Sequence, residues 1–218
     1  MRKVFTAIIV LSISLTTFAQ SEGDLDNKFY FRFGYVNPLN SYLGVENEDF
    51  NLWDEFTKRG AAFEIGSIFM LNSIPLPDGL RIGINADYLD MTANYLNEVD
   101  YDFTILMFKV AAKVGPSISF SPVEDLVFDA FFKAQVPIFG MMTNIGEDAY
   151  DELFLGWGGI GFATGFNVRW KFLMTGFEFN TVSMLLEEVD DGYYFGSFDS
   201  DEDKTPLPEI RVTFGFCF

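Results

Sequence analysis

The sequence predicts an all-β protein, a transmembrane up-and-down antiparallel β-barrel of eight strands that follows a cleaved signal peptide. Three observations support this fold class. The last nine residues alternate between apolar and small or polar side chains, seven earlier segments alternate in the same way, and the connections alternate between long and short. Because successive side chains point to opposite faces of a strand, each segment has one apolar face and one small or polar face.

The last segment, 210–218, carries the strongest pattern. Its apolar face consists of Ile210, Val212, Phe214, Phe216 and Phe218. The closing strand of a transmembrane barrel pairs with the first strand and presents apolar side chains to lipid. This ending resembles the carboxy-terminal strand signal by which bacterial outer-membrane barrels are recognised for insertion. Phe214, Phe216 and Phe218 are therefore the predicted insertion signal.

The amino-terminal residues have the three parts of a secretory signal peptide. Arg2 and Lys3 are basic, 7–15 is an apolar stretch, and Thr17-Phe18-Ala19 places small residues before a cleavage point. We expect residues 1–19 to be the signal peptide and 20–218 to be one barrel domain. The alternative is a buried first helix. No cysteine stands directly after the cleavage point for a lipid anchor, and no later apolar run is long enough for a transmembrane helix.

Each of the seven earlier predicted strands has an apolar face that consists mostly of aromatic and branched residues. In chain order these faces are Phe29, Phe31, Phe33 and Tyr35 in 27–36; Phe63, Ile65, Phe69 and Leu71 in 61–71; Leu80, Ile82, Ile84, Ala86 and Tyr88 in 80–89; Leu106, Phe108, Val110, Ala112, Val114, Ile118 and Phe120 in 103–120; Leu126, Phe128, Ala130, Phe132, Ala134 and Val136 in 126–138; Ile160, Phe162, Phe166, Val168 and Trp170 in 158–170; and Leu173, Thr175, Phe177 and Phe179 in 173–184. Pro116 lies on the apolar face of its strand and predicts a bend or a bulge there.

The connections indicate how the barrel is oriented. The long ones, which are acidic, are 37–58, 90–101, 140–156 and 187–205; the short ones are 72–79, 121–125 and 171–172. Outer-membrane barrels have short periplasmic turns and longer extracellular loops. We therefore expect both termini to be periplasmic and the long loops to be extracellular.

A soluble eight-stranded barrel such as a lipocalin, with the aromatic residues inside, is the competing architecture. Its interior would have to hold these faces of mostly Phe, Leu and Ile, whereas an eight-stranded barrel holds only a modest filling of side chains. The opposite faces are rich in glycine, which packs well in a narrow interior. The transmembrane arrangement is the better prediction.

Charged residues of both signs lie on or beside the small or polar faces. The basic ones are Arg32, Arg81, Lys109, Lys113, Lys133, Arg169, Lys171 and Arg211, and the acidic ones are Glu64, Asp87, Asp129, Glu178 and Glu209. Charges inside a barrel must pair, because unpaired buried charge is costly. We predict a closed ionic network in the lumen that includes Arg32, Glu64, Arg81, Lys109, Asp129, Arg169 and Glu178.

The chain from residue 20 onward resembles the small eight-stranded outer-membrane barrels, the family of the OmpA transmembrane domain and OmpX. The signal peptide, the strand count, the alternation and Phe218 carry this resemblance. They specify the architecture more strongly than the activity. The resemblance implies a bacterial outer-membrane location and a structural protein, an adhesion or defence surface, a narrow pore or, rarely, a lipid enzyme.

The chemistry of the residues does not favour an enzyme or a cofactor. The chain has no histidine, so the general base that we would look for in enzymatic barrels of this class is missing. Cys217, the single cysteine, is read as a small buried filler rather than a reactive thiol. The segment Asp199–Asp203 begins like a calcium loop, but Lys204 and Ile210 stand where glycine and glutamate are required. No specific metal site is predicted.

The charge of the chain limits its partners. Without Arg2 and Lys3, 12 basic and 32 acidic residues remain, a net charge of −20. Such a surface repels nucleic acid and also anionic lipid headgroups unless cations bridge them. We expect outer-membrane lipid, lipopolysaccharide and the barrel-insertion machinery as partners, with divalent cations or a basic protein at the loops. The predicted role is structural or in surface interaction, and the alternative is a narrow pore for ions or small solutes.

Overall fold

The computed structural model describes residues 25–39, 56–98, 103–146, 153–188 and 205–218. These residues form nine β-strands, which are β1 (Lys28–Pro38), β2 (Phe56–Met70), β3 (Leu80–Glu98), β4 (Phe103–Val123), β5 (Leu126–Gly146), β6 (Leu153–Trp170), β7 (Leu173–Glu188), β8 (Thr205–Pro206) and β9 (Glu209–Cys217). None of the described segments is a helix of the length and apolar character needed to cross a membrane.

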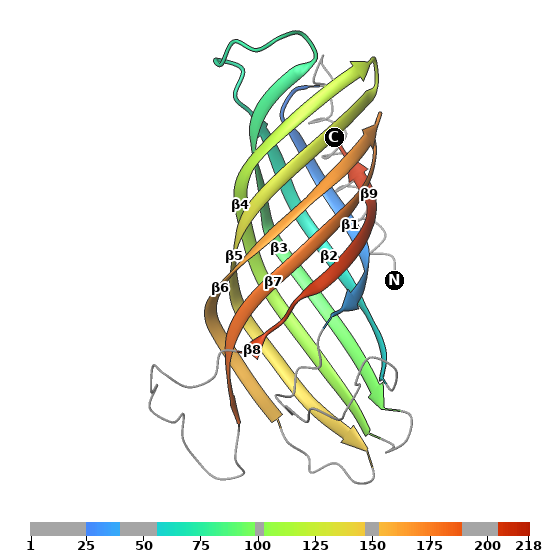
Figure 1. Cartoon of the computed structure of the whole chain (residues 1–218), viewed down its shortest axis with the longest axis vertical. Helices are drawn as coiled ribbons and strands as arrows, with labels where there is room; N and C mark the ends of the chain where they lie inside the picture. The colour runs from blue at the N-terminus through green and yellow to red at the C-terminus, as the bar shows by residue number, and fades with distance from the viewer. Residues whose placement is uncertain (1–24, 40–55, 99–102, 147–152, 189–204) are drawn as a thin grey trace, which may run out of the picture.

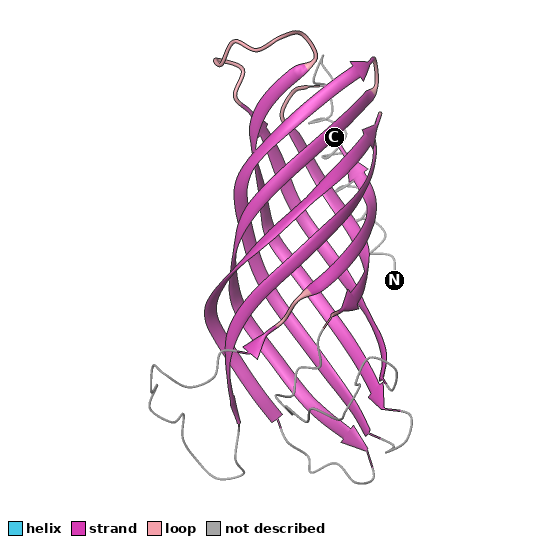
Figure 2. Ribbon diagram, in the orientation of Figure 1, coloured by secondary structure: helices cyan, strands magenta, loops and turns pink. Residues whose placement is uncertain are grey.

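The strands close into a barrel (Figures 1 and 2). Each strand from β1 to β7 pairs antiparallel with the next one, and β9 pairs antiparallel with both β7 and β1. The two-residue strand β8 pairs only with β7, so β8 and β9 together form the eighth stave. The predicted fold class, an eight-stranded up-and-down antiparallel barrel, is confirmed.

The two faces of the wall have the polarity of a membrane-spanning barrel. Outward side chains are apolar and exposed, for example Phe33 at 59%, Val114 at 54% and Ile160 at 71%. Inward positions hold most of the buried charged and amide side chains. Lipid accepts an apolar outer surface, and closure leaves no unpaired strand edge within it. The chain therefore spans the membrane as a barrel with a polar lumen.

The described strands are longer than the sequence predicts. The predicted strand 80–89 continues to Glu98, 126–138 continues to Gly146, and 158–170 begins at Leu153. At the remaining ends β2 starts at Phe56 and β7 reaches Glu188. The predicted loops 37–58, 90–101, 140–156 and 187–205 are therefore wrong in their bounds.

Three β-bulges explain most of this difference. Register shifts lie between Asp87 and Asp90 in β3, at Ile138 in β5, and between Trp157 and Ile160 in β6. A bulge adds one residue to a strand, so inward positions change from odd to even numbers or the reverse. In β3, Asn85 and Asp87 point inward before the bulge, whereas Asp90, Thr92 and Asn94 do so after it. The predicted strands 80–89 and 126–138 end, and 158–170 begins, where a bulge interrupts the simple alternation.

No β-bulge lies at Pro116, where the sequence predicts a bend or a bulge. Pro116 pairs with Ile84 of β3 without a register shift. On the other side, the pairs Val114–Ala134 and Ser117–Phe131 keep the same register between β4 and β5. The proline removes one ladder donor, since it has no N–H, and leaves the strand otherwise regular.

The wall is uneven in height. The nine residues of β9 rise roughly 22 Å at a tilt of about 40°, which matches the apolar band of about 25 Å in such barrels. The 21 residues of β4 and of β5 rise roughly 50 Å. The end of the barrel at which 40–55, 99–102, 147–152 and 189–204 connect is called the loop end here, and the opposite end the turn end. Figure 1 shows β3 to β6 projecting past β1 and β9 at the loop end.

Candidate functional site: the charged lumen

Twelve charged side chains lie in the lumen, and each is at most 2% exposed. The basic ones are Arg32, Lys109, Lys113, Lys133, Arg169 and Arg211, and the acidic ones are Glu64, Asp87, Asp90, Asp129, Glu178 and Glu209. Six positive charges therefore face six negative charges in the described interior. The interior is balanced even though the whole chain carries a net charge of −18.

Arg32 on β1 connects opposite sides of the barrel. Its guanidinium pairs with Glu64 on the neighbouring β2, lies 3.0 Å from Glu178 on β7 and donates at 2.7 Å to the Oδ1 atom of Asn167 on β6. The same group lies 5.2 Å from the ring centroid of Tyr30 and 6.0 Å from that of Phe131. Attraction of a cation to an aromatic face stabilises such an arrangement where water is excluded.

Two lysines bring β4 and β5 into the same network. The Nζ atom of Lys113 lies 3.1 Å from Glu64 and 3.0 Å from Asp90, and it also pairs with Glu178. The Nζ atom of Lys133 lies 2.5 Å from Asp87 and 3.5 Å from Glu178. Because these carboxylates are shared, removal of one cation affects several anions at once.

Arg211 on β9 extends the network toward the loop end. Its Nη1 atom lies 2.7 Å from Asp90 and 2.8 Å from Glu64, and its Nη2 atom donates to Thr92 and pairs with Glu209. Glu209 in turn lies 2.9 Å from Lys109. Ten of the twelve charged residues are therefore joined by a continuous series of ion pairs.

Asp129 and Arg169 form a second group nearer the turn end. Arg169 binds the Asp129 carboxylate through two parallel hydrogen bonds, from Nε at 2.7 Å and from Nη2 at 2.9 Å. The Ser119 hydroxyl donates to the same carboxylate at 2.5 Å. This two-point geometry is the strong form of an arginine–carboxylate pair.

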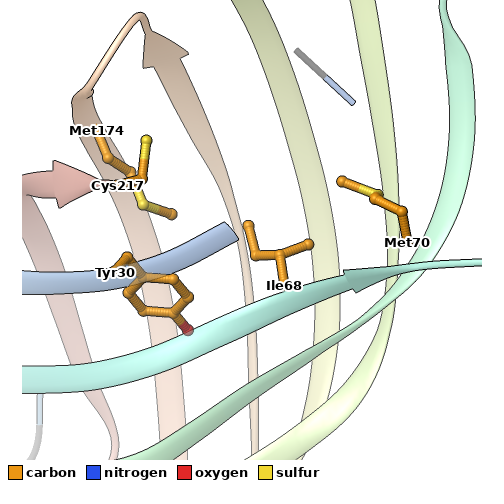
Figure 3. Close-up of a cluster of buried hydrophobic side chains, with 5 residues drawn as sticks. All are labelled: Tyr30, Ile68, Met70, Met174 and Cys217. Atoms are coloured by element: carbon orange, nitrogen blue, oxygen red, sulfur yellow. The ribbon is translucent and has the colours of Figure 1, made fainter. Parts of the chain in front are cut away.

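Apolar side chains lie in the lumen on both sides of these charges. At the turn end the cluster consists of Tyr30, Ile68, Met70, Met174 and Cys217 (Figure 3). The buried inward residues toward the loop end are Ile105, Met107, Met142, Val182, Met184 and Leu207. The lumen thus has an ionic layer between two apolar layers, and the sequence pattern does not predict the apolar layers.

The structure places the seven residues of the predicted network in three ways. Arg32, Glu64, Lys109 and Glu178 lie in the large network, and Asp129 and Arg169 lie together in the second group. Arg81 is only partly buried, and its Nη1 atom donates to the carbonyl of Leu80; it forms no ion pair within the described part of the chain. Arg81 is the second residue of β3 and therefore lies next to the turn end.

Sequence reasoning missed Asp90 as an inward residue, because the bulge beside it interrupts the alternation. It assigned Asp87, Lys113, Lys133, Glu209 and Arg211 to the inward faces without including them in the network. Among the basic residues of the described lumen, Lys113 has the most ion-pair partners, four, and Arg211 has three. Their position at the middle height of the barrel can be assigned only once the register between the strands is known.

The predicted insertion residues lie on the outer face of the closing seam. The ring of Phe31 on β1 lies 5.4 Å from the ring of Phe216 and 6.0 Å from that of Phe218, and the Phe214 and Phe216 rings are 6.0 Å apart. Phe218 also exchanges two backbone hydrogen bonds with Phe29, at 2.8 and 2.9 Å. The last residue therefore takes part in closing the barrel.

The remaining chemical candidates are structural in character or lie elsewhere. The Cys217 thiol is buried and lies 3.7 Å from the carbonyl oxygen of Lys171. In the described segments, histidine, cysteine and carboxylate side chains do not form a group of three or more that could hold a metal ion. Asp199–Asp203 and the signal peptide 1–19 lie outside the described residues. The arrangement of charges holds the strands together across the lumen.

Comparisons with known proteins find similar solved structures only. No family model and no curated protein sequence matches the chain. The structure of Ail, the attachment invasion locus protein of Yersinia pestis, aligns over 88% of this chain and 99% of that one, with 11% identity and a TM-score of 0.46. The transport unit of the autotransporter AIDA-I from Escherichia coli aligns over 90% and 91%, with 6% identity and a TM-score of 0.40. CarO of Acinetobacter baumannii aligns over 88% and 97%, with 10% identity and a TM-score of 0.20.

Proposed function

We propose that this protein is a closed outer-membrane barrel that acts through its acidic loop end, where it binds divalent cations or a basic partner at the cell surface. Residues 1–19 are the signal peptide, 20–218 form the barrel, and both termini are periplasmic. The loop end is extracellular and contacts the lipopolysaccharide layer. The barrel-insertion machinery recognises the closing strand through Phe214, Phe216 and Phe218.

The balance of charge inside the barrel is the observation that supports this function. The six buried cations and six buried anions compensate one another, so the acidic excess of the chain is carried by its other residues. Between the described strands, the loop-end connections 40–55, 99–102, 147–152 and 189–204 contain seventeen acidic residues and one basic residue, Lys204. Like charges at this density repel one another, and screening acts over only about 8 Å at physiological salt. Cations or a basic surface would relieve the repulsion.

The same balance disfavours a pore and an enzyme. The charged side chains that could line a conduction path are engaged with one another across the middle of the lumen. Each buried carboxylate also has a cation within ion-pair distance, so none is poised to accept a proton from a substrate. A structural or surface-interaction role requires neither conduction nor catalysis.

Cation binding tests this function. Calorimetric titration of the refolded barrel with calcium or magnesium should give saturable heat that persists in a matched concentration of sodium chloride. The double variant Asp201→Asn with Glu202→Gln should weaken binding. The matched control, Asp78→Asn with Glu124→Gln, removes two exposed charges at the turn end and should leave binding unchanged.

Protease nicking of the loops provides the second measurement. With millimolar calcium or magnesium the loops should be protected relative to chelator, and the loop variant should lose part of that protection. Equal nicking in both conditions, together with no saturable heat, would mean that the acidic loops are simply solvated and would overturn cation binding as the function.

A further inference from the structure

Two buried amide side chains in the lumen have no hydrogen-bond partner among the residues that the structure describes. Gln135 and Asn180 are both 0% exposed. Among the described residues, neither the amide oxygen nor the amide nitrogen of either side chain forms a hydrogen bond to the protein. Buried polar groups are almost always bonded to protein or to ordered water, so these two amides require a partner.

The register places both amides beside the ion network. Gln135 on β5 pairs with Lys113 on β4 and with Gly161 on β6. Asn180 on β7 pairs with Ala163 on β6 and with Glu209 on β9. The two amides therefore face the lumen on either side of β6.

At the level of the two amides, the described part of the intervening strand β6 has no polar inward side chain that could serve as their partner. The inward positions of β6 at this level are Gly161 and Ala163, which carry no polar side-chain atom. A Cβ atom at Gly161 would lie 2.2 Å from the carbonyl oxygen of Thr181. Close packing of β6 against β7 thus requires glycine at this position, and this row offers the amides no side-chain donor or acceptor.

The neighbouring charged groups are already engaged. Lys113 contacts Glu64, Asp90 and Glu178, and Glu209 contacts Lys109 and Arg211. A neutral partner that both donates and accepts hydrogen bonds suits a primary amide, which has two donors and one acceptor oxygen. Water has this chemistry and makes about three hydrogen bonds at buried polar sites.

We infer that Gln135 and Asn180 bind ordered water inside the lumen, at the flank of the ion network. The water completes the hydrogen bonds of both amides and does not form part of a conducting column, since the ionic layer closes the lumen beside it. The ion network and the bound water then form one packed layer of the lumen, in which the water has a structural role. This inference is independent of any cation binding at the loops.

Solution NMR of the refolded barrel in nanodiscs tests this site. In 15N-edited spectra selective for water, the side-chain NH2 groups of Gln135 and Asn180 should show cross-peaks to long-lived bound water. The variants Gln135→Met and Asn180→Leu assign the two signals by their loss. Asn94 is the internal control, because it is equally inward and its amide nitrogen donates to Glu209 at 3.5 Å; its water cross-peak should be weaker.

A crystal structure at a resolution that shows ordered solvent gives the second readout. Water within hydrogen-bond distance of an amide atom of each residue is the expected result. The inference would be overturned if ordered solvent is visible but no water lies within hydrogen-bond distance of these amides. It would also be overturned if the NMR cross-peaks are absent and the two amides bond directly to each other or to neighbouring side chains.

Discussion

Lys113 provides the sharpest test of the ion network, because one ammonium group serves several carboxylates. Its Nζ atom lies 3.1 Å from Glu64 and 3.0 Å from Asp90 and also pairs with Glu178. Lys113→Met keeps much of the apolar stem and removes the charge. The described lumen then holds six anions and five cations.

The expected cost follows from the number of partners. Breaking a buried ion pair by removing one member costs about 3–5 kcal/mol, because the other charge stays buried without compensation. Lys109→Met is the matched control, since Lys109 is equally buried but pairs with Glu209, which keeps Arg211 as a partner. Its cost should be about 1.5–3 kcal/mol, the value of a hydrogen bond to a charged group.

The free energy of unfolding can be measured by urea titration of the refolded barrel in lipid vesicles, followed by tryptophan fluorescence. The midpoint should fall further for Lys113→Met than for Lys109→Met, with an unchanged slope. Adding Glu178→Gln to Lys113→Met restores equal charge and should recover about 0.5–3 kcal/mol, the range found for directly coupled residues. Free energies of both single variants within about 0.5 kcal/mol of the unsubstituted protein would refute the reasoning, because surface-like positions behave in that way.

Two further predictions concern the closing strand and the bulge in β6. Phe218→Ala should slow assembly in the outer membrane because it removes the aromatic end of the closing strand. Phe120→Ala, at an exposed aromatic of β4 away from the closing seam, should not. Normal membrane levels and normal heat-modifiable gel mobility of the Phe218 variant would contradict this. Gly159→Ala should lower the free energy of unfolding by more than about 1 kcal/mol, because Gly159 has φ +110° and its Cβ would lie 2.0 Å from the carbonyl oxygen of Ser183. Gly158→Ala, at φ +72° with no atom within 4 Å, should cost less, and equal losses of the two variants would argue against close packing at the bulge.

The architecture could be predicted because the period of two is a local property of each strand. Alternation is visible in every predicted segment, and it specifies which face meets lipid without knowledge of any partner strand. The strand ends could not be predicted, because a local pattern does not show that the alternation continues after a bulge with its two faces exchanged. Near Asp87, Ile138 and Trp157 the register shifts, and a bulge reverses the pattern without leaving a clear composition signal of its own.

The charged lumen was only partly predictable. Alternation identifies Arg32, Glu64 and Glu178 as inward residues, but the vertical row of each depends on the register between strands. The alternation places Asp90 in a loop because this residue follows the bulge, and it places Arg81 in the network although Arg81 lies near the turn end and bonds to the carbonyl of Leu80. A contact across the lumen, such as Arg32 with Glu178, has no local signature in the sequence.

The single-channel conductance of the refolded barrel in planar lipid bilayers tests the closed lumen most directly. In the closed barrel that we propose, the six cations and six anions engaged across the described interior block the passage of ions. A large porin reconstituted in the same way provides the positive control. A closed lumen predicts a flat baseline for this protein under conditions in which the porin conducts, and regular conductance steps from the unsubstituted protein would contradict it.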